Sequence, residues 1–348
     1  MVTRLPPPPH LVDPGERNRS KVRSVRDTLD LVLALDTDPD RVPTARIATG
    51  FDLIDRVLDG GLRAHDLMLL GGSPGVGKTV AALQLARHVA IHGRTALYLS
   101  YEHDEPTMLG RLLALELGEM SRPDIAPEID RLRGVVVEAS AGFRSLDQAI
   151  RTEPLVADAC ERLGNYADRL LLVRGSGAHT DLAAIEAAVT GSGTDDGGVL
   201  VVDYLQKVAV HPDPQNEAEK VTKVAEGLKD LALAHDVAVV ALVAADWEGL
   251  RAGRVRLHHL RGSSALAYEA DVAIILNEKH KAVSRDHLAY DTVKAEKFKQ
   301  LVVFSVEKNR GGPARVDLEF RKDFLHYRFE TRGSYMAERS VDDRLEPT

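Results

Sequence analysis

The sequence predicts an α/β domain in which helices flank a mostly parallel central sheet. Short apolar runs alternate along the chain with longer stretches of helical spacing, which is the pattern of strands joined by crossover helices. The first apolar run leads directly into a glycine-rich loop, and a helical stretch follows that loop. In such a fold the carboxyl ends of the strands are where a ligand is expected to bind.

Length and composition agree with a globular protein. The chain has 348 residues, enough for one large domain or two ordinary ones, and its 44% apolar and 28% charged content excludes a disordered or fibrous chain. Its 53 acidic against 45 basic residues leave a net charge of −8. The whole surface is therefore no general binder of polyanions, and any contact with nucleic acid must be local.

Cysteine content and hydropathy indicate a cytoplasmic protein without a membrane role. The single cysteine, Cys160, can form neither an intrachain disulfide nor a multi-thiolate metal site. The first ten residues contain four consecutive prolines and no apolar segment of a secretory signal. The longest apolar stretch, Val237 to Ala245, is too short to cross a bilayer.

Residues 1–43 are predicted to form a Pro-rich tail followed by an amphipathic docking helix. Asp13 can cap this helix and Pro14 suits its first turn. Apolar side chains recur at helical spacing at Val22, Val25, Leu29, Val32 and Leu33, and Arg17, Arg19, Lys21, Arg23 and Arg26 make the first half basic. Such a helix needs a surface to pack on, either its own domain or a neighbouring subunit.

Residues 44–332 are predicted to form the α/β domain, and residues 333–348 a charged tail. The expected strands, in order, are 67–71, 96–100, 170–173, 199–203, 237–243, 272–276 and 301–307. Helical stretches lie between most of them.

The loop after the first strand has the full pattern G-x-x-x-x-G-K-[ST]. Its residues are Gly72, Ser73, Pro74, Gly75, Val76, Gly77, Lys78 and Thr79. Glycines allow successive backbone N–H groups to point at phosphate oxygens, the lysine adds charge at the β- and γ-phosphates, and the threonine hydroxyl reaches Mg²⁺. The flanking strand and helix disfavour an accidental glycine-rich turn, so we expect ATP and Mg²⁺ as ligands.

Two carboxylates follow expected strands. Asp203 ends the apolar run that begins at Val199, where a carboxylate can hold the Mg²⁺ shell; the alternative is a turn-capping aspartate. Glu102 comes just after the second strand, where it can orient and deprotonate the water that attacks the γ-phosphate. Asp104 and Glu105 are interpreted as solvated residues at the start of a helix.

Four landmarks in chain order carry a family resemblance. Before the phosphate loop stand Thr49-Gly50-Phe51, Asp55-Arg56 and Gly60-Gly61-Leu62; after it come Leu99-Ser100-Tyr101-Glu102, then Asp203-Tyr204-Leu205-Gln206, then Lys308-Asn309-Arg310-Gly311-Gly312-Pro313. Over residues 44–332 the chain thus resembles the ATPases of the RecA fold, and among them the hexameric DnaB-type helicases of superfamily four. The Lys-Asn-Arg segment also resembles the RadA branch.

The resemblance implies a ring-like homo-oligomer, a hexamer, with active sites shared between subunits. Lys78, Thr79, Glu102 and Asp203 would act within one subunit, whereas Lys308 and Arg310 would reach the nucleotide of its neighbour. A monomer should then hydrolyse ATP poorly. Without the resemblance, a solvated basic turn closed by Gly311, Gly312 and Pro313 would be the favoured interpretation of Lys308 and Arg310.

Two departures from the family pattern affect the expected role. Where DnaB relatives place a glutamine that senses the γ-phosphate, this chain has Ala244, and Asp246 or Gln206 are the candidates to take its place. Only the short tail precedes the core, where replicative helicases carry the helical domain that engages primase. We therefore expect a specialised or accessory protein rather than the main replicative motor.

A basic segment is the predicted contact with single-stranded DNA. Its basic residues are Arg251, Arg254, Arg256, His258, His259 and Arg261, with no acid among them. In the family this loop faces the central channel, where copies from several subunits would form a positive collar that tracks phosphates. The alternatives are a solvated loop or a contact between subunits. Aromatic residues do not alternate with the arginines, so base stacking is not expected.

The favoured function is an oligomeric, Mg²⁺-dependent ATPase that acts on single-stranded DNA as a helicase, translocase or remodeller. The alternative is a RadA- or KaiC-like regulatory ATPase whose nucleotide state controls partner binding without strand separation. A small-molecule kinase on the same core is a third possibility, which the Asp203-Tyr204-Leu205-Gln206 and Lys308-Asn309-Arg310 segments disfavour.

Overall fold

A computed structural model describes residues 24–36, 46–194, 197–262, 264–283, 292–338 and 340–341. The chain divides into two units, Met1–Ala45 and Arg46–Thr348. In the first unit the described part is helix α2 (Val25–Asp36), which Ser24 and Asp27 cap by accepting each other's backbone N–H, at 3.0 and 3.1 Å. This confirms helix at Val25, Leu29 and Leu33, whereas the predicted cap at Asp13 and Pro14 lies outside the described residues.

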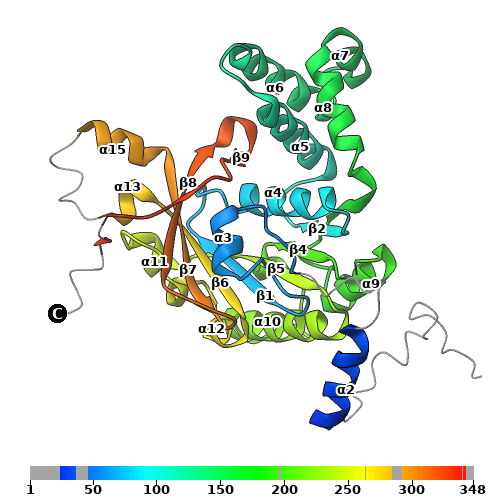
Figure 1. Ribbon diagram of the computed structural model, residues 1–348, viewed down its shortest axis with the longest axis vertical. Coiled ribbons are helices and arrows are strands. Elements are labelled where there is room, and N and C mark those ends of the chain that lie inside the picture. The colour runs from blue at the N-terminus through cyan, green and yellow to red at the C-terminus, as the bar shows by residue number, and fades with distance from the viewer. Residues whose placement is uncertain are drawn as a thin grey trace, which may run out of the picture. The chain divides into compact units, whose positions relative to one another are not determined.

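The second unit is built on one sheet (Figure 1), which has ten strands within the described residues. Its order is β10-β8-β7-β6-β1-β5-β4-β2-β3, with β9 paired to β8. The strands are β1 (Leu67–Gly72), β2 (Ala96–Ser100), β3 (Leu170–Arg174), β4 (Val199–Asp203), β5 (Ala238–Ala244), β6 (Val272–Glu278), β7 (Leu301–Asn309), β8 (Val316–Asp323), β9 (Arg328–Phe329) and β10 (Ser334–Tyr335). Strands β1 to β6 are parallel, and β7, β8 and β10 extend the sheet in antiparallel fashion.

The structure confirms all seven expected strands and adds three. Strand β8 was not predicted, although Val316, Leu318 and Phe320 alternate with polar residues as in a half-buried strand. Strand β10 pairs Tyr335 with Leu318, so the sheet continues past residue 332 and the charged tail begins later than predicted.

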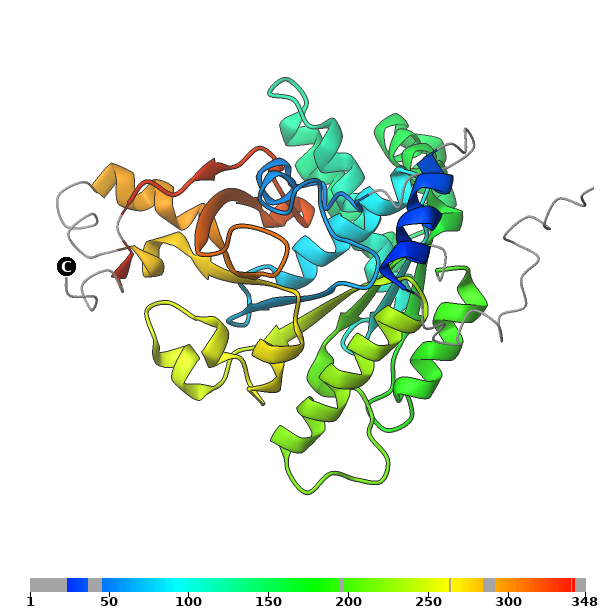
Figure 2. The same ribbon diagram turned by 60° about the horizontal axis from the view of Figure 1, so that its bottom comes forward.

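Helices cover both faces of the sheet, as Figures 1 and 2 show. Alternate residues of each strand point to opposite faces. One face, with Met68 and Leu70, packs on α3 (Asp52–Val57) and α4 (Lys78–Ile91). The other, with Leu67 and Leu69, packs on α9 (Leu182–Ser192), α10 (Glu217–Ala234) and α12 (Ala265–Glu269). The shorter helices are α11 (Trp247–Arg251), α13 (Lys279–Ala282) and α15 (Thr292–Lys299), with 3₁₀ turns η2 (Ala167–Arg169), η3 (Leu205–Lys207), η4 (Leu257–His259) and η5 (Phe324–His326).

Four helices between β2 and β3 form a core of their own (Figure 1). They are α5 (Glu105–Met120), α6 (Ala126–Ser140), α7 (Leu146–Thr152) and α8 (Pro154–Gly164). Glu116 of α5 is fully buried and joins this group to the sheet layer by an ion pair with Arg87 of α4, at 2.5 Å. Within the group it also pairs with Arg162 of α8, at 3.0 Å. The Tyr166 hydroxyl donates to the same carboxylate at 2.7 Å. The arginines and the hydroxyl outweigh burial and lower the pKa of Glu116.

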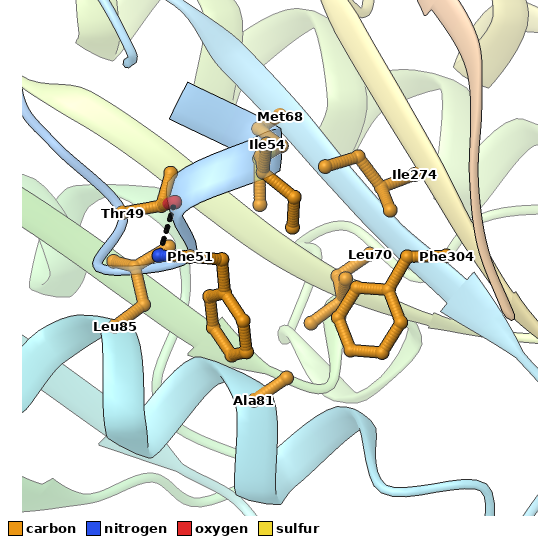
Figure 3. A pocket seen from close by; sticks show the side chains of 9 residues that line it. All are labelled: Thr49, Phe51, Ile54, Met68, Leu70, Ala81, Leu85, Ile274 and Phe304. Carbon is orange, nitrogen blue, oxygen red and sulfur yellow. Dashed lines mark hydrogen bonds between the residues drawn. The ribbon is translucent and has the colours of Figure 1, made fainter. Parts of the chain in front are cut away.

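The segment before β1 is anchored against α4. The Asp55 carboxylate accepts the backbone N–H and the hydroxyl of Thr49, both at 2.7 Å, and fixes the turn that presents Phe51. Figure 3 shows Phe51 between Ala81 and Leu85 of α4 on one side and Phe304 of β7 on the other. The Phe51 and Phe304 ring centroids are 5.6 Å apart. This packing holds α4, and therefore the loop at its start, against the sheet.

Among the described residues, no helix is both long enough and apolar enough to cross a bilayer.

Candidate functional site

The glycine-rich loop connects central strand β1 to α4. Gly72, Gly75 and Gly77 have φ values of 146°, 76° and 103°, a region in which other residues are strained. At Gly77 a Cβ would also lie 2.6 Å from the Phe324 ring, so only glycine fits. The loop residues predicted from the sequence therefore lie together, in the conformation that a phosphate cradle requires.

Lys78 is the buried cation of this loop, with 3% of its surface exposed. Its Nζ donates to the carbonyl oxygens of Gly72, at 2.8 Å, and Ser73, at 2.9 Å. Burial lowers the pKa of Lys78 to about 8, although the charges of Asp203 and Glu102 oppose that shift. At neutral pH the ammonium group is still mostly charged, so it can bind an anion entering the loop.

Asp203 ends β4, which is separated from β1 by β5. The residue is fully buried, and the Tyr98 hydroxyl donates to its Oδ2 at 2.8 Å. Burial raises the pKa of Asp203 to about 6, while hydrogen bonds from Tyr98 and Thr79 oppose the shift. Oδ1 has no hydrogen-bond partner among the described residues. Oxygen donors on Asp203 and Thr79, one of them buried and unpaired, fit a hard divalent cation such as Mg²⁺.

Glu102 lies next to the buried residues Lys78 and Asp203. Ser100, the last residue of β2, is opposite Asp203 in the β2–β4 pairing, and Glu102 follows two residues later. The Ser100 hydroxyl oxygen accepts the backbone N–H of His103 at 3.0 Å and shapes the turn that carries Glu102. The Glu102 carboxylate is exposed to water. It is nevertheless close enough for its charge to oppose the lowering of the Lys78 pKa and to add to the raising of the Asp203 pKa. This is the placement that a base acting on water needs.

One wall of the site was not predicted from the sequence. A pocket beside Lys78 and Thr79 is also lined by His103, Arg111, Tyr204, Phe324 and Tyr327. The guanidinium of Arg111 lies 5.2 Å from the centre of the Tyr327 ring. Phe324 and Tyr327 belong to the turn between β8 and β9, which were not predicted as strands. No motif marks this turn, because only the antiparallel extension of the sheet brings it to the loop.

Lys308 and Arg310 lie at the opposite edge of the sheet from Lys78. Strand β7 runs antiparallel to β6, so its end pairs with the start of β6, Ala273 opposite Lys308. The glycine-rich loop instead begins where β1 ends. Arg310 and the following turn are exposed. The structure thus keeps these two cations away from the loop of their own chain and leaves them accessible to another molecule.

The basic segment 251–261 is not one continuous positive surface, which corrects the sequence prediction. Arg254 is 3% exposed, with its guanidinium bonded to Ser340, Ser305 and Asp317. It is an internal structural group and not a contact for DNA.

The other three arginines of the predicted DNA contact differ in their exposure to solvent and in their partners. Arg256 is partly buried and pairs with Glu307 at 3.3 Å. Arg251 and Arg261 are exposed; Arg251 lies 5.9 Å from the Trp247 ring centre, and Arg261 pairs with Glu217 at 2.8 Å.

Ala244 ends β5 where the family pattern has a glutamine that senses the γ-phosphate. The two candidates to replace that glutamine, Asp246 and Gln206, have different surroundings. Asp246 is used as the cap of α11, accepting the Gly249 N–H at 2.7 Å. Gln206 lies beside Ala244: its Oε1 is 3.5 Å from the Ala244 N, and its Nε2 donates to the Arg261 carbonyl at 3.1 Å. Gln206 thus links the ends of β4 and β5 to the basic segment through its side chain, whereas Asp246 reaches that segment through its backbone N–H, which donates to the His259 carbonyl at 2.8 Å.

Fold and site together define a P-loop protein with a RecA-like sheet. Residues 46–329 match the family described as "DnaB-like helicase C terminal domain", and the chain belongs to that family.

The chain is also similar to two curated relatives, and it shares its fold with a solved structure. The chain is 27% identical over 285 residues to the replicative DNA helicase DnaB of Treponema pallidum, covering 81% of this chain and 55% of that protein. It is 44% identical over 85 residues to the DNA repair protein RadA of Mycolicibacterium smegmatis, covering 24% of this chain and 18% of that protein. A solved DnaB-like replicative helicase shares the fold, with a TM-score of 0.65 and 18% identity over 88% of this chain and 68% of that one. The chain spans about half the length of the DnaB relative.

The reassignment of Arg254 predicts a stability effect. Arg254→Ala should lower the free energy of unfolding by about 3–5 kcal/mol, because it leaves Asp317 and two hydroxyls without their buried partner. Arg251→Ala, in the exposed part of the same segment, should change it by no more than about 0.5 kcal/mol. Urea denaturation of both variants measures the difference, and equal stabilities would contradict the structural role.

Proposed function

We propose that the protein is a Mg²⁺-dependent ATPase that works as a ring-like oligomer, a hexamer, on single-stranded DNA in the cytoplasm. The observation that carries the proposal is the division of charged groups between two edges of one sheet. Lys78, Asp203 and Glu102 meet at one edge. Lys308 and Arg310 lie at the other, where a neighbouring subunit can use them. Neither edge alone holds a complete hydrolytic site.

Within one subunit the residues have separate tasks. The loop N–H groups and Lys78 would bind the β- and γ-phosphates, and Thr79 with Asp203 would hold Mg²⁺. When bound, the cation neutralises negative charge on the phosphates. Glu102 would orient the attacking water and accept its proton. The pocket wall of Tyr327 and Arg111 is close enough to the loop to receive the rest of the nucleotide.

Lys308 and Arg310 would complete the site of the neighbouring subunit. Among the described residues, Asp271 is the acidic partner of Arg310, and Lys308 donates to backbone carbonyls. A planar guanidinium suits the oxygens of a transferred phosphoryl group. DNA contact rests on Arg251 and Arg261, which are exposed, rather than on the full basic segment. The names of the relatives, replicative DNA helicases among them, support a DNA substrate.

A RadA- or KaiC-like regulatory ATPase is the second candidate. Ala244 favours it, because a strand end without a polar side chain there has less means of reporting the γ-phosphate. The local identity to RadA is consistent with it. The two candidates differ in whether DNA accelerates hydrolysis.

The first prediction concerns chemistry within one subunit. Lys78→Ala should abolish ATP hydrolysis, whereas Glu102→Gln should bind ATP normally and lose at least about 100-fold in turnover, because only the base is removed. Phosphate release and the binding of a fluorescent ATP analogue measure the two effects. Asp104→Asn is the matched control, since this nearby carboxylate caps α5 through the Thr107 N–H. Turnover of Glu102→Gln near that of the control would refute the base assignment.

The second prediction separates motor from regulator. ATP hydrolysis by the assembled oligomer, its mass verified in nucleotide, should rise several-fold with single-stranded DNA. A double Arg251→Ala, Arg261→Ala variant should respond less, with a shallower dependence on salt, because fewer phosphates are neutralised. Hydrolysis that ignores DNA in a verified oligomer would favour the regulatory ATPase.

The third prediction concerns sharing of the site. Arg310→Ala and Lys78→Ala should each be inactive alone and should regain activity when mixed into one oligomer. In the mixture, an intact pocket of one variant meets the intact arginine of the other. Absence of rescue in oligomers shown by native mass measurement to be mixed would place Arg310 outside the chemistry of its neighbour.

A further inference from the structure

We infer that Asp271 is the positioning residue of the arginine that one subunit offers to the next. This inference rests on the proposed sharing of the site, and it adds a residue that no motif in the sequence marks. Asp271 lies between α12 and β6, at the edge of the sheet opposite the glycine-rich loop. Only 8% of its surface is exposed, yet it contacts Arg310, which is largely exposed.

The two oxygens of the Asp271 carboxylate have different partners. Oδ1 accepts from the Arg310 Nη1 at 3.1 Å. Oδ2 accepts from the Lys229 Nζ at 2.7 Å and from the backbone N–H of Leu67 at 2.9 Å. The Asp271 carbonyl also accepts the Arg310 backbone N–H at 2.9 Å. Arg310 is therefore fixed at its backbone and its side chain by one residue.

The end of α12 completes the support. Arg310 also donates through Nη2 to the Tyr268 carbonyl, and Lys308 Nζ donates to the carbonyls of Ala267, at 2.6 Å, and Tyr268, at 3.1 Å. These are last-turn carbonyls of α12, which carry partial negative charge. They hold both cations by backbone atoms alone. Asp271 is the side chain that sets the direction of the guanidinium.

Charge explains why the carboxylate is needed. Lys229, Lys308 and Arg310 bring three cations to this edge, and Asp271 makes direct ion pairs with two of them. Its charge and that of Glu269 oppose the lowering of the Lys308 pKa, which burial causes first and Arg310 second. Without the Asp271 charge the cations repel one another, and the exposed Arg310 is the one free to swing away into water.

The same carboxylate ties the arginine to the strand of the phosphate loop. Leu67, whose N–H it accepts, is the first residue of β1, and Gly72 at the other end of β1 begins the loop. Arg310, the arginine offered to the neighbouring subunit, is thus fixed to the strand that carries the subunit's own nucleotide site. Asp271 acts through Arg310 and does not touch the nucleotide.

Asp271→Asn tests the inference, because it keeps the shape of the side chain and removes its charge. We expect kcat for ATP to fall by about ten- to a hundredfold, the range of a slightly misplaced catalytic group, with KM within about twofold. Glu269→Gln is the matched comparison, because it removes a charge from the same neighbourhood without a hydrogen bond to Arg310. Its kcat should fall clearly less than that of Asp271→Asn, and an equal loss would assign the effect to charge alone and overturn the positioning role.

Mixed oligomers distinguish a role in the neighbour from a local structural role. Asp271→Asn mixed with Lys78→Ala should regain activity, since the Asp271→Asn pocket is intact and the Lys78→Ala subunit supplies a well-placed arginine. Lys78→Ala could rescue Arg310→Ala but fail to rescue Asp271→Asn. That result would overturn the inference, because the Asp271→Asn defect would then act through β1 on the pocket of its own subunit. The proposed function would still stand. Failure of both mixtures would remove the shared site itself.

Should the Asp271→Asn chain not fold, Asp271→Glu keeps the buried charge and displaces the carboxylate by one methylene. The same mixing experiment then applies. Rescue by Lys78→Ala would support the inference, and wild-type kcat in the unmixed Asp271→Glu protein would overturn it.

Discussion

The direction of one strand determines how this molecule can work. Strands β1 to β6 are parallel, and their carboxyl ends bring the glycine-rich loop, Glu102 and Asp203 to one edge of the sheet. Strand β7 reverses, so Lys308 and Arg310 come out at the opposite edge. The two sets therefore lie at opposite ends of the strands and do not meet within one chain. Any chemistry that uses both must join two molecules.

At the edge of the sheet that carries the glycine-rich loop, the two buried charged groups, Lys78 and Asp203, have few charged partners of their own. Lys78 is satisfied by carbonyls of its own loop, and Asp203 has one oxygen bonded to Tyr98 and one without a partner among the described residues. Burial pushes the pKa values of both groups toward neutrality, to about 8 and about 6. An anion at Lys78 and a cation at Asp203 each favour the charged form. The site is therefore organised around ligands that carry both signs of charge, as a nucleotide with its metal does.

The sequence predicted those parts whose signal is local. The seven main strands and the glycine-rich loop follow from apolar runs and from a motif that only a few residue types can satisfy. Arg254 shows the limit of charge patterns. Its acidic partner, Asp317, stands 63 residues later, so the run of arginines looked uniform although one of them is buried. The Tyr327 wall and Asp271 were missed for the same reason, because pairings between distant strands place them and no local pattern marks them.

At each edge of the sheet, a side chain connects the strand ends to another part of the chain. At the loop edge, Gln206 bridges the end of β5 and the carbonyl of Arg261, and the Arg261 N–H donates in turn to the Ala244 carbonyl at 2.9 Å. At the other edge, Asp271 bridges Arg310 and the start of β1. Strand β1 lies directly beside β5 and β6, so a shift at either edge is felt by the same central strands. Ala244 has no polar side chain, so the side chain of Gln206 joins the nucleotide edge to the basic segment alongside two backbone bonds, from the Arg261 N–H to the Ala244 carbonyl and from the Asp246 N–H to the His259 carbonyl at 2.8 Å. In the proposed oligomer, these hydrogen bonds at the strand ends are the contacts through which one nucleotide site would be connected to the next.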